Sequence, residues 1–279
     1  MNKFIKIGKI SLLALALFSL NSCKDYFELT DNPNLVQTPP LNALLTTATH
    51  KAAFNNYRIA YFNNQYSQYF ASPSGGSDTD TYQITNNSST WNNLFYSLAD
   101  LYDFMVKSEE AGATHHLAVA QALTAYQLAL VADTWGSVPF SKAFGKEETL
   151  TVPFDSEEDL YKAQVDLINK ALENFKKTDA TQELSEKDDL LCGGDLDKWI
   201  KLTNGLKARV LNKISKKAAY NPKQVLAAAQ ASLESNAEDV GMSTFDGVNP
   251  WASISISNLL NNLDGWLGSN FIDQMNGKT

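Results

Sequence analysis

The sequence predicts an all-α protein, and three observations lead to that fold class. Apolar residues recur at spacings of three and four along most of the chain, which is the period of an amphipathic helix. Residues suited to begin a helix stand before several of these segments. Almost no stretch alternates apolar and polar residues as a half-buried strand does. The predicted architecture is therefore a layered array of paired helices joined by long loops.

The first helical segment is predicted over residues 41–70, after a proline-rich stretch that ends at Pro40. A polar segment over residues 72–89 interrupts the pattern and reads as a long loop, because it contains proline, paired glycines and many short polar residues. A loop of this length inside a compact domain is more often functional or disordered than neutral. Tyr82 and Ile84 in its middle predict that it packs in part against the helices.

Five further helices are predicted from residues that favour a helix start. Thr90 is the expected N-cap of a helix over 91–107, and Thr114 the expected N-cap of a helix that continues to Asp133. The other expected starts are Asp155–Ser156, Asp195 or Asp197, and Asn221–Pro222. Beyond Ser235 the pattern gives way to Gly, Asn, Ser and Trp. Paired helices of this kind indicate an array similar to tetratricopeptide repeats, although no clean 34-residue repeat is present.

The first 22 residues have the features of a lipoprotein signal peptide. Three lysines precede an apolar run over 10–20, which is too short to span a membrane and suits a signal-peptide core. The run ends in Leu20-Asn21-Ser22-Cys23, which fits the box where a cysteine thiol receives a diacylglyceryl group. Several acyl chains anchor a protein stably, whereas one anchors it only marginally. We therefore expect a signal peptide (1–22), an acylated tether and docking strap (23–40) and a helical domain (41–279); the alternative is an ordinary secretory signal with a chance cysteine.

Charge and cysteine content limit the partners of the mature chain. The whole sequence has 23 basic and 31 acidic residues, and removal of the three signal-peptide lysines leaves 20 basic residues against 31 acidic ones, a net charge of −11. This balance argues against a nucleic-acid partner and against electrostatic attachment to anionic headgroups. Cys23 and Cys192 are the two cysteines of the sequence, so acylation of Cys23 leaves Cys192 without an intramolecular partner. Cys192 is expected to be a buried or half-buried thiol.

Residues that carry catalysis or bind metals do not form a recognisable pattern. His115 and His116 are adjacent and His50 is distant, so none has the i, i+4 spacing of a helical metal pair. We expect these histidines to be solvated or capping rather than ligands. Paired acids, such as Asp188–Asp189, lie at helix starts or in polar loops, where the helix dipole favours them. We therefore predict no catalytic residues, no metal and no cofactor.

Aromatic residues are the strongest indication of a binding site. Sugar rings present flat C–H faces that stack on indole and phenol rings, and their hydroxyls pair with amide side chains. Trp91, Asn92 and Asn93, which follow the loop that carries Tyr82, fit this chemistry. Trp251 or Trp266 in the Asn-rich C-terminal part are further candidates. The alternative for any one of these rings is packing in the core or between helices.

Three segments resemble the SusD/RagB-like lipoproteins of Bacteroidetes. The mature start, Cys23 to Leu29 followed by Asp31-Asn32-Pro33-Asn34, is similar to the start of that family. Asp133-Thr134-Trp135-Gly136-Ser137-Val138-Pro139-Phe140 resembles the family's Asp-x-(aromatic)-Gly-x-(Val/Ile)-Pro-(aromatic) corner. Residues 193–209, which include Gly193-Gly194-Asp195 and Lys198-Trp199, resemble its Gly-Asp-x-x-Lys-Trp helix, although Thr203 and Gly205 replace its usual Ala and Ser. The segments keep the family's order.

The resemblance implies a tetratricopeptide-like fold and a lipoprotein, acylated at Cys23, on the outer face of the outer membrane. Lys24-Asp25 is similar to the family's charged sorting cue. The implied function is non-enzymatic capture of an oligosaccharide or peptide for a SusC-like TonB-dependent transporter. The resemblance also implies that the chain ends, at residues 276–279, about half-way through a usual member. The alternative is a helical scaffold lipoprotein that acts only through protein partners, with a glycosidase as a more distant third possibility.

Overall fold

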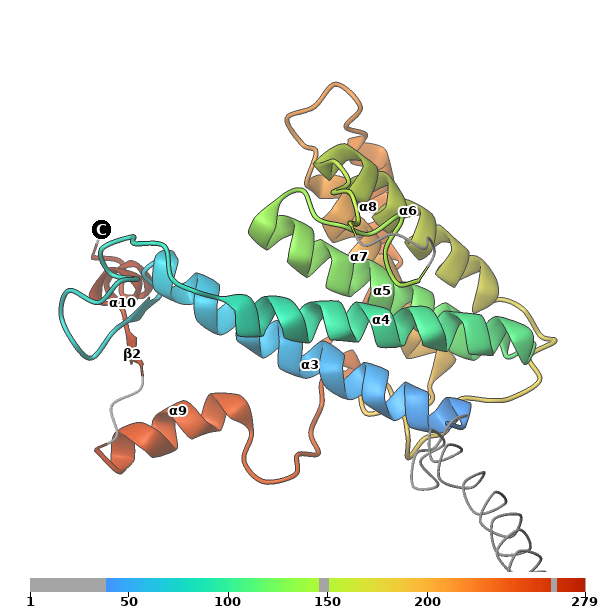
Figure 1. The fold of residues 1–279 in the computed structure, drawn as a ribbon, viewed down its shortest axis with the longest axis horizontal. Helices are drawn as coiled ribbons and strands as arrows, with labels where there is room; N and C mark the ends of the chain where they lie inside the picture. Colours follow the sequence, from blue (N-terminus) through green and yellow to red (C-terminus); the bar gives the residue numbers. More distant parts are fainter. Residues whose placement is uncertain (1–38, 146–150, 262–264, 279) are drawn as a thin grey trace, which may run out of the picture. The chain divides into compact units, whose positions relative to one another are not determined.

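The structure is a computed structural model that describes residues 39–145, 151–261 and 265–278. The predicted signal peptide, Cys23 and the tether up to residue 38 lie outside the described residues. The predicted α class is confirmed (Figure 1). The described helices are α3 (Leu41–Tyr66), α4 (Ser88–Glu110), α5 (Thr114–Trp135), α6 (Glu157–Asn174), α7 (Leu196–Asn212), α8 (Pro222–Gln230), α9 (Pro250–Leu259) and α10 (Ser269–Met275), with a 3₁₀ turn at Asn236–Glu238.

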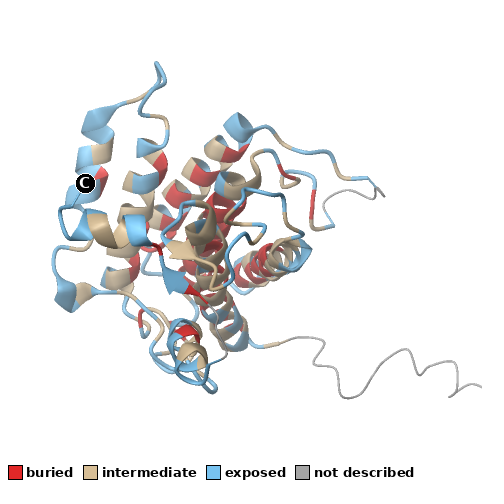
Figure 2. Cartoon of the chain, turned by 90° about the vertical axis from the view of Figure 1, so that its left-hand side faces the viewer, coloured by how far each residue is buried: buried red, intermediate tan, exposed pale blue. Residues whose placement is uncertain are grey.

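Helix α5 is the centre of the helical array. It packs against α3, α4, α6 and α7, and each helix from α3 to α7 also packs against its successor. Fifteen of its 22 residues are buried, and they lie on every side of the helix. Many of them are alanines, whose small side chains allow four neighbouring helices to approach closely. The buried residues gather in α3 to α7, whereas α8, α9 and α10 are mostly exposed (Figure 2).

Buried polar side chains join α5 to its neighbours. Asn55 of α3 donates to Gln127 Oε1 at 3.1 Å, and Asn174 at the end of α6 donates to Gln121 Oε1 at 2.9 Å. Because a buried amide without a partner costs free energy, these pairs favour one relative placement of the helices over shifted ones.

Two of the three described histidines differ from the expectation of solvated or capping residues. His115 and His116, in the first turn of α5, are 9% and 0% exposed. His115 Nε2 lies 2.9 Å from the carbonyl of Lys177, and His116 Nε2 lies 3.0 Å from Asn42 Oδ1. The expectation was wrong for this pair, because α5 is covered on all sides and even its first turn is buried. His50 is exposed and stacks on Phe54.

Three of the predicted helix starts are confirmed by hydrogen bonds. Ser156 Oγ accepts from the backbone N–H of Asp159 at the start of α6, and Asp195 Oδ1 accepts from that of Lys198 at the start of α7. Asn221 Oδ1 accepts from the N–H groups of residues 223 and 224, with Pro222 in the first position of α8. These caps satisfy amides that have no partner within the helix.

The two threonine caps were predicted wrongly. Helix α4 begins at Ser88, because Asn86 Oδ1 accepts from the Ser88 N–H and brings the chain into the helix before Thr90. Helix α5 begins at Thr114 itself, since the left-handed Gly112 (φ 64°) ends α4 and leads directly into the next helix. The first helix also ends earlier than residue 70, because Gln68 is left-handed and Phe70 enters a strand.

The corner after α5 is held by one carboxylate. Asp155 accepts from the backbone N–H groups of Phe140 at 2.7 Å and Ser141 at 2.8 Å, and from the Ser141 hydroxyl. Gly136 caps α5 with φ 75° and ψ −120°, a conformation that is nearly restricted to glycine. The predicted Asp133–Phe140 motif is therefore a rigid turn from α5 toward α6.

A second carboxylate organises the turn before α7. Asp189 is 3% exposed and accepts from the indole Nε1 of Trp199 at 2.7 Å, as well as from the backbone N–H groups of Leu191, Cys192 and Gly194. Four donors satisfy this buried charge. Cys192 is buried, as expected, and burial together with the nearby Asp189 raises the pKa of its thiol.

The C-terminal part contains helices that the sequence pattern did not predict. Helices α9 and α10 follow the 3₁₀ turn, and the two-residue strands β1 (Phe70–Ala71) and β2 (Trp266–Leu267) pair antiparallel, with Phe70 opposite Leu267. This pairing places α10 next to the chain that leaves α3 (Figure 1). Within the described ranges, no helix is both long and apolar enough to cross a membrane.

Candidate functional site

An open groove with aromatic walls lies where α3 ends and α4 begins. Its volume is about 530 Å³, and we call it the aromatic groove. It is lined by Phe62, Asn63 and Tyr66 of α3, by residues 82–85, 87 and 88, and by Trp91, Thr134 and Trp135. None of these lining side chains is charged. A surface of rings, amides and hydroxyls can stack on an apolar face and exchange hydrogen bonds with hydroxyl groups at its edge.

Trp91 is the fixed part of this groove. Its ring stacks on Phe95 with centroids 4.3 Å apart, and it meets the ring of Trp135 edge to face at 5.3 Å. Both tryptophans are half-buried. A ring held on two sides loses little conformational entropy when a ligand stacks on its remaining surface.

The long loop forms the opposite wall and is attached to α3 by a phenol. Tyr66 Oη donates to the carbonyl of Gln83 at 2.8 Å and lies 3.2 Å from the Thr85 hydroxyl. The loop packs in part against α3, as predicted, but Tyr82 and Ile84 are 61% and 100% exposed and are not the side chains that attach it. The backbone of the loop, rather than its large side chains, supplies this hydrogen-bonded attachment.

Tyr82 has a strained backbone. Its φ of 57° lies in the left-handed region, which disfavours residues with a Cβ, and its N–H donates to the carbonyl of Thr79 at 3.2 Å. This conformation costs on the order of 1 kcal/mol. Strain of this kind accumulates at functional sites, and here it leaves a phenol ring exposed on the groove wall.

The structure brings together two of the four predicted ligand residues. Tyr82 and Trp91 both line the aromatic groove. Asn92 is exposed outside it, and Asn93 donates its amide to the carbonyl of Ser89 at 2.8 Å, one turn earlier in α4. Successive residues of a helix differ in direction by about 100°, so Trp91, Asn92 and Asn93 point three ways.

Several groove residues were not identified from the sequence as ligand candidates. Asn63 and Gln83 contribute amides that make no side-chain hydrogen bond within the described residues, and Trp135 contributes a second indole. Trp135 lies in the Asp133–Phe140 motif. That motif predicted the turn after the helix and did not indicate a ligand-binding residue. The proximity of Trp135 to Trp91 depends on how α5 packs beside α4.

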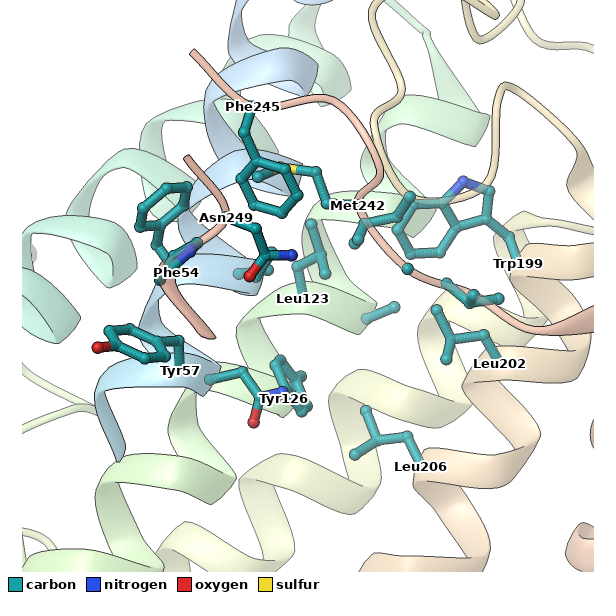
Figure 3. A pocket seen from close by; sticks show the side chains of 18 of the residues that line it. Phe54, Tyr57, Leu123, Tyr126, Trp199, Leu202, Leu206, Met242, Phe245 and Asn249 are labelled. Carbon is teal, nitrogen blue, oxygen red and sulfur yellow. The ribbon is translucent and has the colours of Figure 1, made fainter. Parts of the chain in front are cut away.

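An apolar cavity of about 380 Å³ lies between α3, α5, α7 and residues 240–251. Figure 3 shows side chains from all four elements around it, including Phe54, Leu123, Trp199 and Phe245. Two of its polar groups are occupied, because the Thr203 hydroxyl donates to the carbonyl of Trp199 and Asn249 Oδ1 accepts from the Trp251 N–H. Such walls offer few partners for sugar hydroxyls, so the aromatic groove is the better glycan candidate.

The other two predicted tryptophans are not in the aromatic groove. Trp251 lines the apolar cavity and meets Tyr57 edge to face at 4.9 Å, and Trp266 lies in β2 with 55% of its surface exposed. Among the described residues, no three His, Cys, Asp or Glu side chains gather as a metal site.

Comparisons with known proteins identify the family and the fold of this chain. A family model described as "Starch-binding associating with outer membrane", of SusD-like proteins, matches residues 33–278. No curated protein matches the chain. A SusD/RagB family protein from Bacteroides thetaiotaomicron superimposes with a TM-score of 0.71 at 22% identity, over 79% of this chain and 49% of the other.

A chitin-binding SusD homolog from Flavobacterium johnsoniae matches with a TM-score of 0.64 at 21% identity, over 80% of this chain and 50% of its own. A SusD homolog from Bacteroides uniformis gives the same TM-score and identity, also over 80% and 50%. The chain thus spans about half the length of the solved structures that it matches.

The fold defines the class of protein. It is a helical array of the kind found among SusD/RagB homologs. The chain belongs to the SusD-like family, whose description places its members in association with the outer membrane.

Proposed function

We propose that this chain is a surface lipoprotein that captures glycan in the aromatic groove and delivers it to a SusC-like TonB-dependent transporter. The observation that carries the proposal is the groove itself, where Tyr82, Trp91 and Trp135 stand beside uncharged amides. The family description and the chitin-binding homolog support glycan rather than peptide as the ligand. The proposal includes no catalysis.

Attachment and location are parts of the same proposal. Residues 1–22 would direct export, acylation of Cys23 would anchor the chain, residues 23–40 would serve as tether and strap, and residues 41–279 would form the binding body. The outer-membrane description of the family supports this arrangement. With an acidic mature chain, the lipid is the expected attachment to the membrane.

The first test is a binding panel on the purified mature chain. We expect retardation in affinity gels that contain soluble starch or glycol chitin, and a calorimetric signal with the matching oligosaccharides. A reducing-sugar assay in the same samples should stay at background, since capture without cleavage is proposed. Absence of binding to every glycan of the panel, with the protein folded, would contradict the proposal.

The second candidate is a scaffold that contacts partners without holding a ligand. The exposed side chains of α9 and β2, including Leu259 and Trp266, favour it, because exposed apolar surface marks contact with other proteins. Alanine at Trp91 and Tyr82 separates the two functions in cells. Lost glycan uptake with normal transporter assembly supports capture, whereas normal uptake with these variants supports the scaffold.

A further inference from the structure

A second, smaller pocket adjoins the aromatic groove and contains a cation. It has a volume of about 320 Å³ and lies between residues 57–65 of α3 and residues 79–90. It shares Phe62, Thr85 and Asn87 with the aromatic groove. Arg58 is the charged residue of its lining, so we call it the arginine pocket. A ligand that extends along α3 from Trp91 would pass from one pocket into the other.

Arg58 has no anionic partner within the described residues. The sequence contains two arginines, and Arg209 lies 3.8 Å from a carboxylate oxygen of Asp133, whereas no ion pair or hydrogen bond of the Arg58 guanidinium is found there. Acidic residues outnumber basic ones by 31 to 23, so an arginine without an acid is notable in this chain. Asp78 and Asp80 flank Thr79 of the pocket, but neither lines it, and Asp80 accepts from the Ser72 N–H.

The chemistry of the remaining lining favours a sugar that bears an acid. The pocket presents aromatic rings, amides and hydroxyls around Arg58, among them Tyr61, Gln65 and Asn86. A guanidinium offers a planar set of donors that matches a carboxylate in two parallel hydrogen bonds. The half-buried position of Arg58 weakens screening by salt relative to a fully exposed lysine.

We propose that the arginine pocket recognises the carboxylate of a uronic-acid residue, one or a few sugars away from the ring that stacks on Trp91. The preferred cargo is then a glycan with carboxylated sugars rather than a wholly neutral one. This inference rests on the proposed function of the aromatic groove. The net negative charge of the chain opposes dense polyanions, so isolated carboxylates are selected by local contact with Arg58.

The test compares how the purified mature chain binds acidic oligosaccharides and the neutral counterparts obtained by reducing their carboxyl groups. Hyaluronan oligomers and largely methyl-esterified oligogalacturonates, in which neutral sugars separate the carboxylates, are the probes, and calorimetry gives the affinities. We expect at least one acidic oligomer to bind about tenfold more tightly than its carboxyl-reduced counterpart. Arg58→Gln should abolish this difference, and Arg58→Lys should restore it in part, because lysine keeps the charge without the planar donors.

Lys223→Gln is the matched control, since it removes one positive charge from the exposed start of α8. It should retain the wild-type preference. Equal affinity for acidic and reduced oligomers, an Arg58→Gln variant that keeps the preference, or carboxylate-dependent binding of peptides alone would overturn the inference. If neutral glycans bind through Trp91 while Arg58→Gln has no effect, the proposed function survives and this inference fails.

Discussion

At the scale of single residues, two conformations have consequences that can be measured. Tyr82 is held with a positive φ while most of its ring is exposed, and the ring meets that of Tyr66 at a centroid distance of 6.5 Å. His116 is fully buried with one ring nitrogen near Asn42 and the other, Nδ1, without a partner. The first residue bears on ligand binding and the second on stability.

The strain at Tyr82 predicts a separation of stability from binding. Tyr82→Asn should raise the free energy of unfolding by a few tenths to about 1 kcal/mol, because asparagine tolerates the left-handed region. The same variant should weaken glycan binding, since the groove loses an aromatic wall. Urea denaturation and calorimetry measure the two effects. A less stable variant with unchanged affinity would show that Tyr82 serves the fold and not the ligand.

Buried His116 predicts a loss of stability in mild acid. Burial, with a smaller contribution from His115, lowers the pKa of His116 from 6.5 to about 4. Between these values the unfolded chain binds a proton that the folded chain does not, so stability falls as the pH drops from 6.5 toward 4, by up to about 3 kcal/mol. His116→Gln should show a smaller loss in urea denaturation between pH 7 and pH 4.5.

The matched control for this variant is His50→Gln, which removes an exposed histidine from α3. An acid sensitivity that is identical in His116→Gln and in the wild-type protein would mean that other groups cause it.

At the scale of helices, hydrogen-bond chemistry decided which starts could be predicted. Ser156, Asp195 and Asn221 cap their helices by accepting from N–H groups two or three residues later. Such contacts involve only neighbouring residues and can therefore be predicted from the sequence. Thr90 and Thr114 have the right side chains, yet the adjoining turns start the helices before their side chains can act as caps. Local chemistry was therefore sufficient only where no competing turn lay next to the cap.

The groove and the C-terminal helices depend on contacts between distant residues. Trp135 reaches Trp91 only because α4 and α5 pack side by side, and β1 pairs with a strand almost 200 residues later. Helix α9 was missed because its sequence has no strong polar face, and α10 because it is short. The fold class and two groove residues could be predicted from the sequence, whereas the arrangement around them could not.

Two glycines predict opposite effects of the same substitution. Gly205 lies inside α7, where alanine is favoured by up to about 1 kcal/mol, and the one close atom that a new Cβ meets is the Ser232 hydroxyl, which can rotate away. Gly136 has a backbone conformation nearly restricted to glycine, and its Cβ would lie 3.0 Å from Glu157 Oε1. Gly205→Ala should raise the melting temperature, and Gly136→Ala should lower stability by about 1–3 kcal/mol. Thermal unfolding that shows the reverse order would contradict this description of both sites.

At the scale of the whole molecule, the chain combines a predicted attachment segment with a helical body for which glycan capture is proposed. The attachment was inferred from residues 1–23 and stays a prediction. The body belongs to a family described as associating with the outer membrane, so export and capture are consistent properties of one protein. The chain covers about half of its solved relatives, and the capture proposal is confined to a groove whose walls lie within this chain.

Acylation at Cys23 predicts a specific pattern of labelling. In cells fed an alkyne analogue of palmitate, the wild-type chain should carry the label and sediment with membranes. Cys23→Ser should lose both properties. Cys192→Ser, which alters the other cysteine of the sequence, should keep them. Label that persists in Cys23→Ser would place the lipid elsewhere.

The central claim is that the aromatic groove holds glycan, and calorimetry of Trp91→Ala beside Tyr96→Ala tests it most directly. Tyr96 is the matched control, because it is a 65% exposed ring on the same helix outside the groove. With the tightest ligand of the panel, Trp91→Ala should weaken binding at least about tenfold, since a stacked ring contributes on the order of 1 kcal/mol beyond its buried area. Tyr96→Ala should match the wild-type protein. Equal affinity of all three proteins for the glycan would contradict the account.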